Sequence, residues 1–135
     1  MSRILILDTS VIVDDLRSGR HQQRMANLSG LVRSSSVVLA ELWRGARKKA
    51  DRDFLEALEL NQPILVPTQK NWLDSGQLLA KIGLKKGFGP EKLRDLHFDV
   101  LIALTARNHG ATVITTNRAD FELIRSYRAF DLEVW

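Results

Sequence analysis

Four carboxylic acids, far apart in the sequence, stand at the ends or on the inward faces of segments expected to be buried. Asp8 closes the apolar run ILIL, and Asp120 lies shortly after the run TVITT. A carboxylate in such a place is costly unless a cation or hydrogen-bond donors compensate its charge. The four acids are Asp8, Glu41, Asp99 and Asp120.

Two of these acids interrupt the apolar faces of predicted helices. Residues three, four or seven positions away on a helix share its face. These neighbours are Val37, Val38 and Gly45 for Glu41, and Ile102, Ala103 and Ala106 for Asp99. Both carboxylates are therefore expected to point inward, with Asp99 at the start of its helix.

Four carboxylates brought together would repel one another and raise each other's pKa values. A hard divalent cation removes this problem, because Mg²⁺ and Mn²⁺ prefer oxygen ligands and Mg²⁺ retains several waters. One or two such ions can activate a water and hold a phosphodiester for in-line displacement. The acids therefore suggest metal-dependent phosphodiester hydrolysis.

Each acid taken alone also has a structural explanation. Asp8 can cap the following helix, and the helix dipole favours Asp99 at a helix start. Asp120 can be a first-turn acid after an Asn117 cap, and Glu41 can pair with Arg44. These explanations compete with the metal site residue by residue, but jointly they require four coincidences.

Other polar residues carry a weaker signal. Asp14 and Asp15 are expected on the solvated face of the first helix. Asp95 lies one helical turn before Asp99 if the helix extends back and can then be an accessory ligand, but a loop or surface position is favoured. The three histidines lack metal-ligand spacing, with His97 alone near the predicted site. No Walker or dinucleotide-binding glycine motif is present.

Strands and helices are expected to alternate, which favours a mostly parallel sheet covered by helices. The predicted strands are 3–8, 31–36, 63–66, 112–116 and 131–134. The predicted helices are 10–17 (capped by Thr9 or Ser10), 20–29, 37–49, 51–60, 69–85, 98–109 and 118–126, and 85–92 is expected to be a basic, glycine-rich loop. In parallel sheets ligands bind beyond the carboxyl ends of strands, where Asp8 and Asp120 would meet.

Length and composition indicate the number of domains, the kinds of site that are excluded, the location and the partners of the protein. The 135 residues predict one domain over 1–135, with 44% hydrophobic and 27% charged residues. No cysteine is present, so disulfides and thiolate metal sites are excluded. The apolar runs are too short to span a membrane and no signal peptide is evident, so a cytoplasmic protein is expected. A net charge of +4 mildly favours a polyanionic partner.

Four segments in order resemble the PIN-domain ribonucleases, in particular the small VapC-type toxins of toxin–antitoxin pairs. These segments are ILDTSVIV at 6–13, SSVVLAEL at 35–42, FDVLIALTA at 98–106 and VITTNRADF at 113–121. Each motif alone is short and degenerate, whereas the four in order span almost the whole chain. The resemblance implies a three-layer α/β/α sandwich around a mostly parallel twisted sheet.

The resemblance also implies a Mg²⁺- or Mn²⁺-dependent endoribonuclease. Asp8, Glu41 and Asp99 match the family's catalytic, metal-binding triad, and Asp120 its fourth acid. The supporting polar positions are Thr9, Ser10, Thr115 and Asn117. The family often carries an acid where Asn117 stands, which leaves open whether one or two ions bind.

The expected partners are RNA, a cognate antitoxin protein and a second copy of the chain in a homodimer or a larger toxin–antitoxin assembly. The basic residues considered for RNA binding are Arg44, Lys85, Lys86 and Arg118, with Arg47, Lys48 and Lys92 as further candidates. Trp43 can stack on a base, although packing is the simpler expectation.

Two other functions remain compatible with the sequence. A PIN-like module can bind nucleic acid or protein without cutting it. A Mg²⁺-dependent phosphoryl-transfer domain of the receiver or phosphatase type also places an acid after its first strand. Receiver-like domains usually pair two acids there and carry a late lysine, whereas here one Asp precedes Thr9 and Ser10.

Overall fold

The computed structural model describes residues 2–135 and contains one five-stranded sheet in which all paired strands are parallel. The strand order is β3-β2-β1-β4-β5. The strands are β1 (Ile4–Leu7), β2 (Leu31–Ser35), β3 (Ile64–Leu65), β4 (Thr112–Thr115) and β5 (Asp131–Val134). The predicted strands are confirmed to within two residues at each end.

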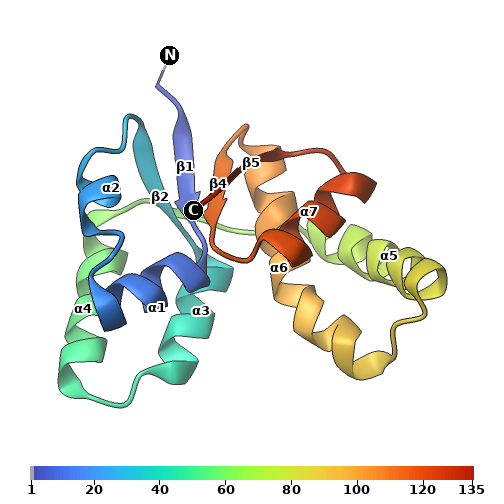
Figure 1. Cartoon of the computed structure of the whole chain (residues 1–135), viewed down its shortest axis with the longest axis horizontal. Coiled ribbons are helices and arrows are strands. Elements are labelled where there is room, and N and C mark those ends of the chain that lie inside the picture. The colour runs from blue at the N-terminus through green and yellow to red at the C-terminus, as the bar shows by residue number, and fades with distance from the viewer. Residues whose placement is uncertain (1) are drawn as a thin grey trace.

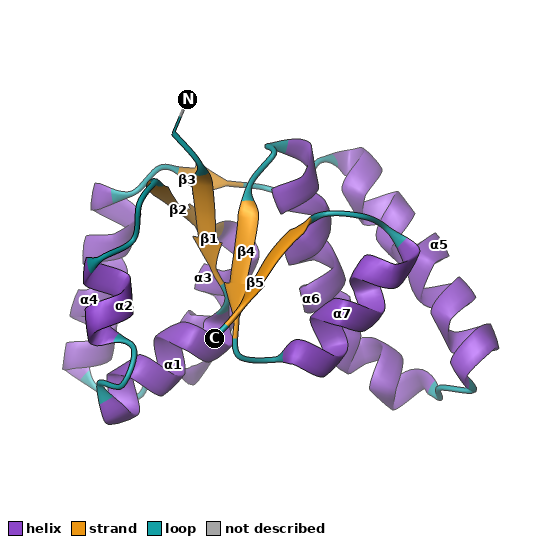
Figure 2. Cartoon of the chain, turned by 45° about the horizontal axis from the view of Figure 1, so that its top comes forward, coloured by secondary structure: helices purple, strands orange, loops and turns teal. Residues whose placement is uncertain are grey.

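Helices connect the strands and cover the sheet (Figure 1). They are α1 (Thr9–Ser18), α2 (Gln22–Ala26), α3 (Ser36–Gly45), α4 (Lys49–Asn61), α5 (Gln69–Lys86), α6 (Pro90–Asn108) and α7 (Arg118–Tyr127). Figure 2 shows the sheet between α1, α2 and α4 on one side and α5, α6 and α7 on the other. The predicted three-layer α/β/α sandwich is confirmed.

The core is densest where α6 packs on β4. The residues from Val100 to Ala106 are all buried, as are Val113 and Ile114 of β4. A helix that is apolar on all sides must be enclosed by other elements. Its contacts with α3, α5, α7 and β4 supply that enclosure and fix its position relative to the sheet.

The connections leave β1 and β4 in opposite directions across the sheet. β1 and β4 are hydrogen-bonded neighbours, but the chain leads from β1 to β2 on one side and from β4 to β5 on the other. Such a reversal opens a crevice at the carboxyl ends of the two strands. Asp8 follows β1 and Asn117 follows β4, so both lie at this crevice.

The predicted start of the helix at residue 98 is wrong, because α6 begins eight residues earlier at Pro90. Its N-cap is Gly89, and proline is well suited to the first helical turn because its missing N–H would have no partner there. The predicted loop 85–92 is therefore mostly helical, and only 87–89 lie outside α5 and α6. Asp99 lies in the middle of α6, where the helix dipole gives it no support.

The first helices also differ from the prediction. Thr9 is the first residue of α1 and Asp8 takes the N-cap position, but the Asp8 side chain makes no capping hydrogen bond. The helix predicted at 20–29 is only the five residues of α2. It ends well before Gly30, which has a φ of +152° and whose missing Cβ would lie 2.8 Å from the carbonyl oxygen of Arg3. Gly30 therefore belongs to the entry into β2 and not to the end of a helix.

Asp14 and Asp15 are half-buried and do more than face solvent, contrary to the prediction. Asp14 Oδ2 lies 2.6 Å from Nε of Arg20 and 2.7 Å from Nε2 of the buried His21. Asp15 Oδ1 accepts a hydrogen bond from the backbone N–H of His21 at 3.0 Å. The two acids therefore tie α1 to the start of α2.

No helix within residues 2–135 combines the length and the apolar character needed to cross a membrane.

Candidate active site

Asp8 is almost fully enclosed at the carboxyl end of β1, with 3% of its surface exposed. Its backbone N–H donates to the Ile114 carbonyl at 2.8 Å, which continues the pairing of β1 with β4. Its Oδ2 accepts hydrogen bonds from Ser10 Oγ at 2.7 Å and Thr115 Oγ1 at 2.8 Å. Burial raises the pKa of the Asp8 carboxyl, and the two hydroxyls oppose that rise.

The hydroxyls of Ser10 and Thr115 are themselves held by backbone groups. Ser10 Oγ accepts from the N–H of Thr116 at 3.1 Å, and Thr115 Oγ1 accepts from the N–H of Asn117 at 2.9 Å. These bonds join the start of α1 to the end of β4. Of the four supporting polar residues predicted from the sequence, Ser10 and Thr115 therefore hold the carboxylate of Asp8.

Glu41 reaches the same place from α3. The Ser35 hydroxyl caps this helix by accepting from the N–H groups of Val37 and Val38, which sets its direction from the end of β2. Glu41 Oε1 accepts a hydrogen bond from Thr9 Oγ1 at 2.8 Å. Burial, together with the charge of Asp8, raises the pKa of Glu41. The predicted inward orientation of Glu41 is confirmed.

Asp99 is the most perturbed of the four acids. Burial is the largest cause, followed by the charges of Asp8, Glu41 and Asp120, and together they raise the pKa of Asp99 to about 8. Within residues 2–135 the Asp99 carboxylate forms no hydrogen bond or ion pair with another side chain. Asp99 on α6 is therefore within electrostatic reach of the three other acids.

Asp120 lies in the first turn of α7 and is compensated by two donors. Its Oδ1 lies 3.1 Å from Lys92 Nζ, and its Oδ2 accepts from Asn117 Nδ2 at 3.1 Å. Asn117 is the N-cap of α7, since its Oδ1 accepts from the backbone N–H of Asp120. The predicted cap is confirmed, and it does not exclude Asp120 from the acidic group.

The four acids have the chemistry of a divalent-cation site but do not form a finished coordination shell. Among residues 2–135, no three acidic, histidine or cysteine side chains stand close enough together to ligate one ion directly. The Asp99 carboxyl is largely desolvated, lacks a side-chain partner and has three acids around it, so a cation would relieve a real electrostatic cost. An ion that retains several waters, such as Mg²⁺, suits this arrangement best.

The basic residues predicted to bind RNA are scattered. Arg44 adjoins the site, because its charge opposes the rise in the pKa of Glu41. Its guanidinium lies 5.6 Å from the centroid of the Phe98 ring. Arg118 pairs with Glu122 at 2.9 Å on the surface of α7. Lys85 lies 6.0 Å from the Tyr127 ring centroid at the other end of α7, and Lys86 is exposed at the end of α5.

Several remaining side chains have structural contacts. Trp43 Nε1 donates to Glu59 Oε1 at 2.7 Å, which joins α3 to α4. His97 pairs with Ser75 at 3.0 Å on α5 instead of turning to the acids. Asp95 is exposed. The contact between Lys92 and Asp120 was not expected from the sequence, because the two residues are 28 positions apart.

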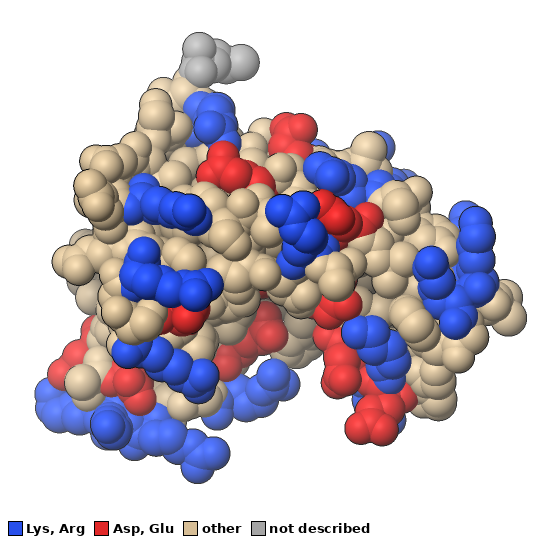
Figure 3. Space-filling model, viewed as in Figure 1, with Lys and Arg blue, Asp and Glu red and all other residues tan. Residues whose placement is uncertain are grey.

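Acidic side chains gather around a hollow between the two halves of the molecule, with Lys and Arg side chains around them (Figure 3). Next to Glu41, an open groove of about 440 Å³ runs between α1, α3 and α4. Apolar side chains line part of it, including Val13, Leu16 and Phe54, and Arg47 and Lys48 add positive charge. Leu16 is 57% exposed, so the groove presents an uncovered apolar surface.

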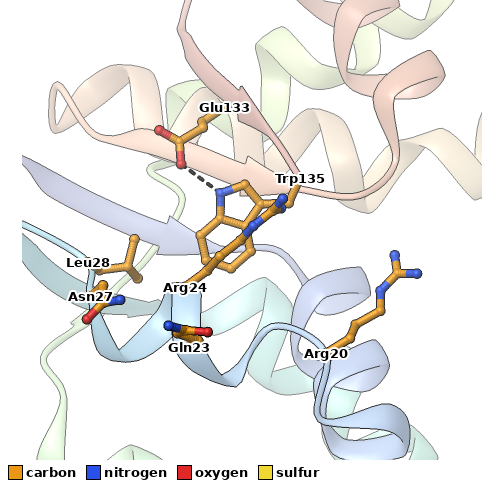
Figure 4. A pocket seen from close by; sticks show the side chains of 7 residues that line it. All are labelled: Arg20, Gln23, Arg24, Asn27, Leu28, Glu133 and Trp135. Carbon is orange, nitrogen blue, oxygen red and sulfur yellow. Dashed lines mark hydrogen bonds between the residues drawn. The ribbon is translucent and has the colours of Figure 1, made fainter.

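A second hollow, of about 480 Å³, lies against Trp135 (Figure 4). Glu133 Oε2 accepts from Trp135 Nε1 at 2.7 Å, and the guanidinium of Arg24 lies 5.6 Å from the indole ring. The backbone N–H of Trp135 donates to the Thr115 carbonyl at 2.8 Å. Trp135 therefore joins this hollow to the end of β4, where the Thr115 hydroxyl binds the Asp8 carboxylate. The sequence did not indicate this relation.

Comparisons with known proteins agree with this geometry. Residues 5–126 match the profile of the PIN domain family. The chain resembles a chain of the VapBC2 crystal structure from Rickettsia felis bound to a promoter DNA fragment, with 26% identity, a TM-score of 0.69 and 98% of each chain covered. No curated protein matches the chain.

Two further solved structures share the fold. A chain of VapBC-1 from nontypeable Haemophilus influenzae is 24% identical, with a TM-score of 0.70 and 98% of each chain covered. A chain of a toxin-antitoxin complex from Klebsiella pneumoniae is 24% identical, with a TM-score of 0.59, and the match covers 87% of this chain and 89% of that one. These matches confirm the resemblance to VapC-type proteins, and this chain belongs to the PIN domain family.

Proposed function

We propose that this protein is a divalent-metal-dependent endoribonuclease and the toxin of a toxin–antitoxin pair. Membership in the PIN domain family, with VapBC proteins as structural neighbours, supports a nuclease toxin in general terms. The observation that carries the finer proposal is the collection of four carboxylates at the crevice between β1 and β4. Burial, together with the charges of the other three acids, raises the pKa of Asp99 to about 8. Strongly perturbed pKa values of this kind are common at functional sites.

In this proposal Asp8, Glu41 and Asp99 bind one Mg²⁺ or Mn²⁺ ion, directly or through water. The ion supplies a Lewis acid that polarises the phosphate and makes water a stronger nucleophile. Ser10 and Thr115 hold Asp8 in place, and Thr9 does the same for Glu41. Because backbone N–H groups hold the hydroxyls of Ser10 and Thr115, the Asp8 carboxylate is positioned before substrate arrives.

RNA is the proposed substrate, and basic side chains near the crevice support that choice. Arg44 lies beside Glu41, so it is the predicted RNA-binding residue best placed to contact a phosphate near the acids. Arg24 and Trp135, in the second hollow, add a cation and an aromatic ring of the kind that stacks on unpaired bases. Lys85, Lys86 and Arg118 remain predictions for more distant backbone contacts.

The groove between α1, α3 and α4 is the proposed docking site of an antitoxin segment. Its apolar lining and its three cations, Arg17, Arg47 and Lys48, fit an amphipathic segment that carries acidic residues. The groove reaches Glu41, so an occupant can cover the acidic site as well. The structural neighbours come from VapBC and toxin–antitoxin complexes, which supports a protein partner for this chain too.

A charge placed in this groove is expected to separate inhibition from cleavage. Leu16→Glu puts a carboxylate on the exposed apolar side chain, opposite the acidic residues expected in the partner. We expect the affinity for the antitoxin to fall about tenfold or more, while RNA cleavage by the free protein stays within about twofold. Calorimetric titration with the antitoxin and a cleavage assay measure the two effects.

The matched control for the groove is Leu84→Glu, which alters an even more exposed leucine on α5. It is expected to leave antitoxin binding unchanged. Equal binding by the Leu16→Glu variant and the original protein would place the antitoxin elsewhere.

A homodimer and a cytoplasmic location complete the proposal. Exposed apolar side chains cluster along the chain from β3 into α5, which supports a protein interface there. They are Ile64, Val66, Trp72 and Leu73. A larger toxin–antitoxin assembly would combine this interface with the antitoxin groove.

Cleavage of RNA by the purified, antitoxin-free protein tests the proposed function. We expect cleavage with Mn²⁺ or Mg²⁺ and none after EDTA, because the acids alone repel both one another and the phosphate. A catalyst of phosphoryl transfer would instead release phosphate from small phosphorylated compounds and leave RNA intact. Binding of RNA without cleavage under every metal condition would favour a PIN-like binding module.

A further inference from the structure

Lys92 on α6 forms an ion pair with Asp120 on α7. Its Nζ lies 3.1 Å from Oδ1 of Asp120, and the other carboxylate oxygen accepts a hydrogen bond from Asn117 at 3.1 Å. Both oxygens of Asp120 therefore already have positively polarised partners. The residue that the family resemblance assigns as the fourth acid is compensated by this chain's own side chains.

The ammonium group of Lys92 is also held against the site. It lies 5.8 Å from the centroid of the Phe88 ring, a distance at which a cation is attracted by an aromatic face. Its charge opposes the rise in the pKa of Asp99 that burial and the neighbouring acids cause. Lys92 therefore acts on two of the four acids.

Asn117 does not offer a free ligand for a second ion. Its side-chain oxygen accepts from the backbone N–H of Asp120 as the cap of α7, and its side-chain nitrogen donates to the Asp120 carboxylate. A Mg²⁺ ion would need to lie about 2.0–2.1 Å from an oxygen of Asp120. An ammonium at 3.1 Å from the same carboxylate leaves little room or charge for it.

We propose that the ammonium group of Lys92 takes the place of a second divalent ion. The site would then work with one ion near Asp8, Glu41 and Asp99, and with Lys92 as the fixed second positive charge beside the RNA phosphate. This inference rests on the proposed metal-dependent cleavage and specifies its metal count. Lysine suits the role because its ammonium is a compact point charge.

Calorimetric titration of the metal-free protein with Mn²⁺ tests the inference without relying on activity. The original protein is expected to bind one ion per chain. In Lys92→Met, which removes the charge but keeps an unbranched side chain, we expect either a second bound ion or at least fivefold tighter binding of the first. Lys81→Met, at an exposed position of α5, is the matched control and is expected to bind like the original protein.

Cleavage at saturating Mn²⁺ provides the second measurement. Loss of a group that stabilises charge in the transition state typically costs about 10²- to 10³-fold, and we expect Lys92→Met to fall in that range. Lys92→Arg keeps the charge and should recover part of the rate. Thermal melts of each variant confirm that it is folded.

Two bound ions in the original protein would overturn the role of Lys92 and leave metal-dependent cleavage intact. One ion of unchanged affinity in Lys92→Met, together with an unchanged cleavage rate, would reduce Lys92 to a surface ion pair. Absence of both Mn²⁺ binding and cleavage in the original protein would instead contradict the proposed function itself.

Discussion

Replacing Asp99 with asparagine is expected to stabilise the metal-free protein and, at the same time, to destroy its activity. Asn keeps the shape of the side chain but removes a largely desolvated carboxylate beside Asp8, Glu41 and Asp120. At pH 7.5 we expect a gain on the order of 2 kcal/mol, or roughly 5–10 °C in the melting temperature. We expect RNA cleavage to fall about 10²- to 10³-fold.

The opposite signs of these two effects make the test specific. Replacing a residue that merely supports the fold lowers both the stability and the activity of the protein. Replacing a metal-binding acid instead raises the stability of the metal-free protein and lowers its activity. Mn²⁺ should raise the melting temperature of the original protein, because it binds the folded state, and should do so much less in Asp99→Asn. Differential scanning calorimetry with and without Mn²⁺ measures both shifts.

Asp95→Asn is the matched control for this experiment. Asp95 lies one turn before Asp99 on α6, but it is exposed. Its replacement is expected to change the free energy of unfolding by no more than about 0.5 kcal/mol and to leave cleavage unaltered. A lower melting temperature in Asp99→Asn would mean that the Asp99 carboxylate makes a stabilising contact. Undiminished cleavage would remove it from the catalytic group.

The sequence predicts the sheet and the first acid well for a physical reason. A short apolar run followed by a single acid marks both a buried parallel strand and the end of that strand, so the run itself assigns Asp8 to the carboxyl edge of the sheet. Glu41 and Asp99 were found by helical periodicity, which requires only the correct face. The Asp99 side chain was assigned to the correct, inward face of its helix, although the predicted start of that helix was wrong by eight residues.

The parts that the sequence missed depend on contacts between distant segments. Gly87 and Gly89 indicated a loop, yet Gly89 is the cap of a helix whose early residue Lys92 reaches Asp120. A lysine among other basic residues gives no local sign that it faces an acid 28 positions away. In the same way, the hydroxyls of Thr9 and Ser10 looked like helix caps, but they bind the carboxylates of Glu41 and Asp8.

The acidic group should also make the metal-free protein less stable as the pH rises from about 4 to 8. In this range folded Asp99 keeps its proton up to a pKa of about 8, whereas the unfolded chain releases it near its ordinary value of about 3.9. The unfolded state therefore binds fewer protons, and each pH unit costs up to about 1.4 kcal/mol of unfolding free energy. The raised pKa values of Asp8 and Glu41 act in the same direction.

A divalent ion should reverse this dependence, because protons and the ion compete for the same carboxylates. The rise in melting temperature produced by a fixed concentration of Mg²⁺ is expected to grow from about pH 5.5 to about pH 8 and then to level off, once Asp99 has lost its proton. Melts in EDTA and in Mg²⁺ across this range, with Asp99→Asn in parallel, provide the measurement. The variant should show a flatter dependence in both conditions. If the metal-free protein instead becomes more stable between about pH 6 and 8, the carboxylates do not repel one another in solution and the basis for a cation at this crevice is lost.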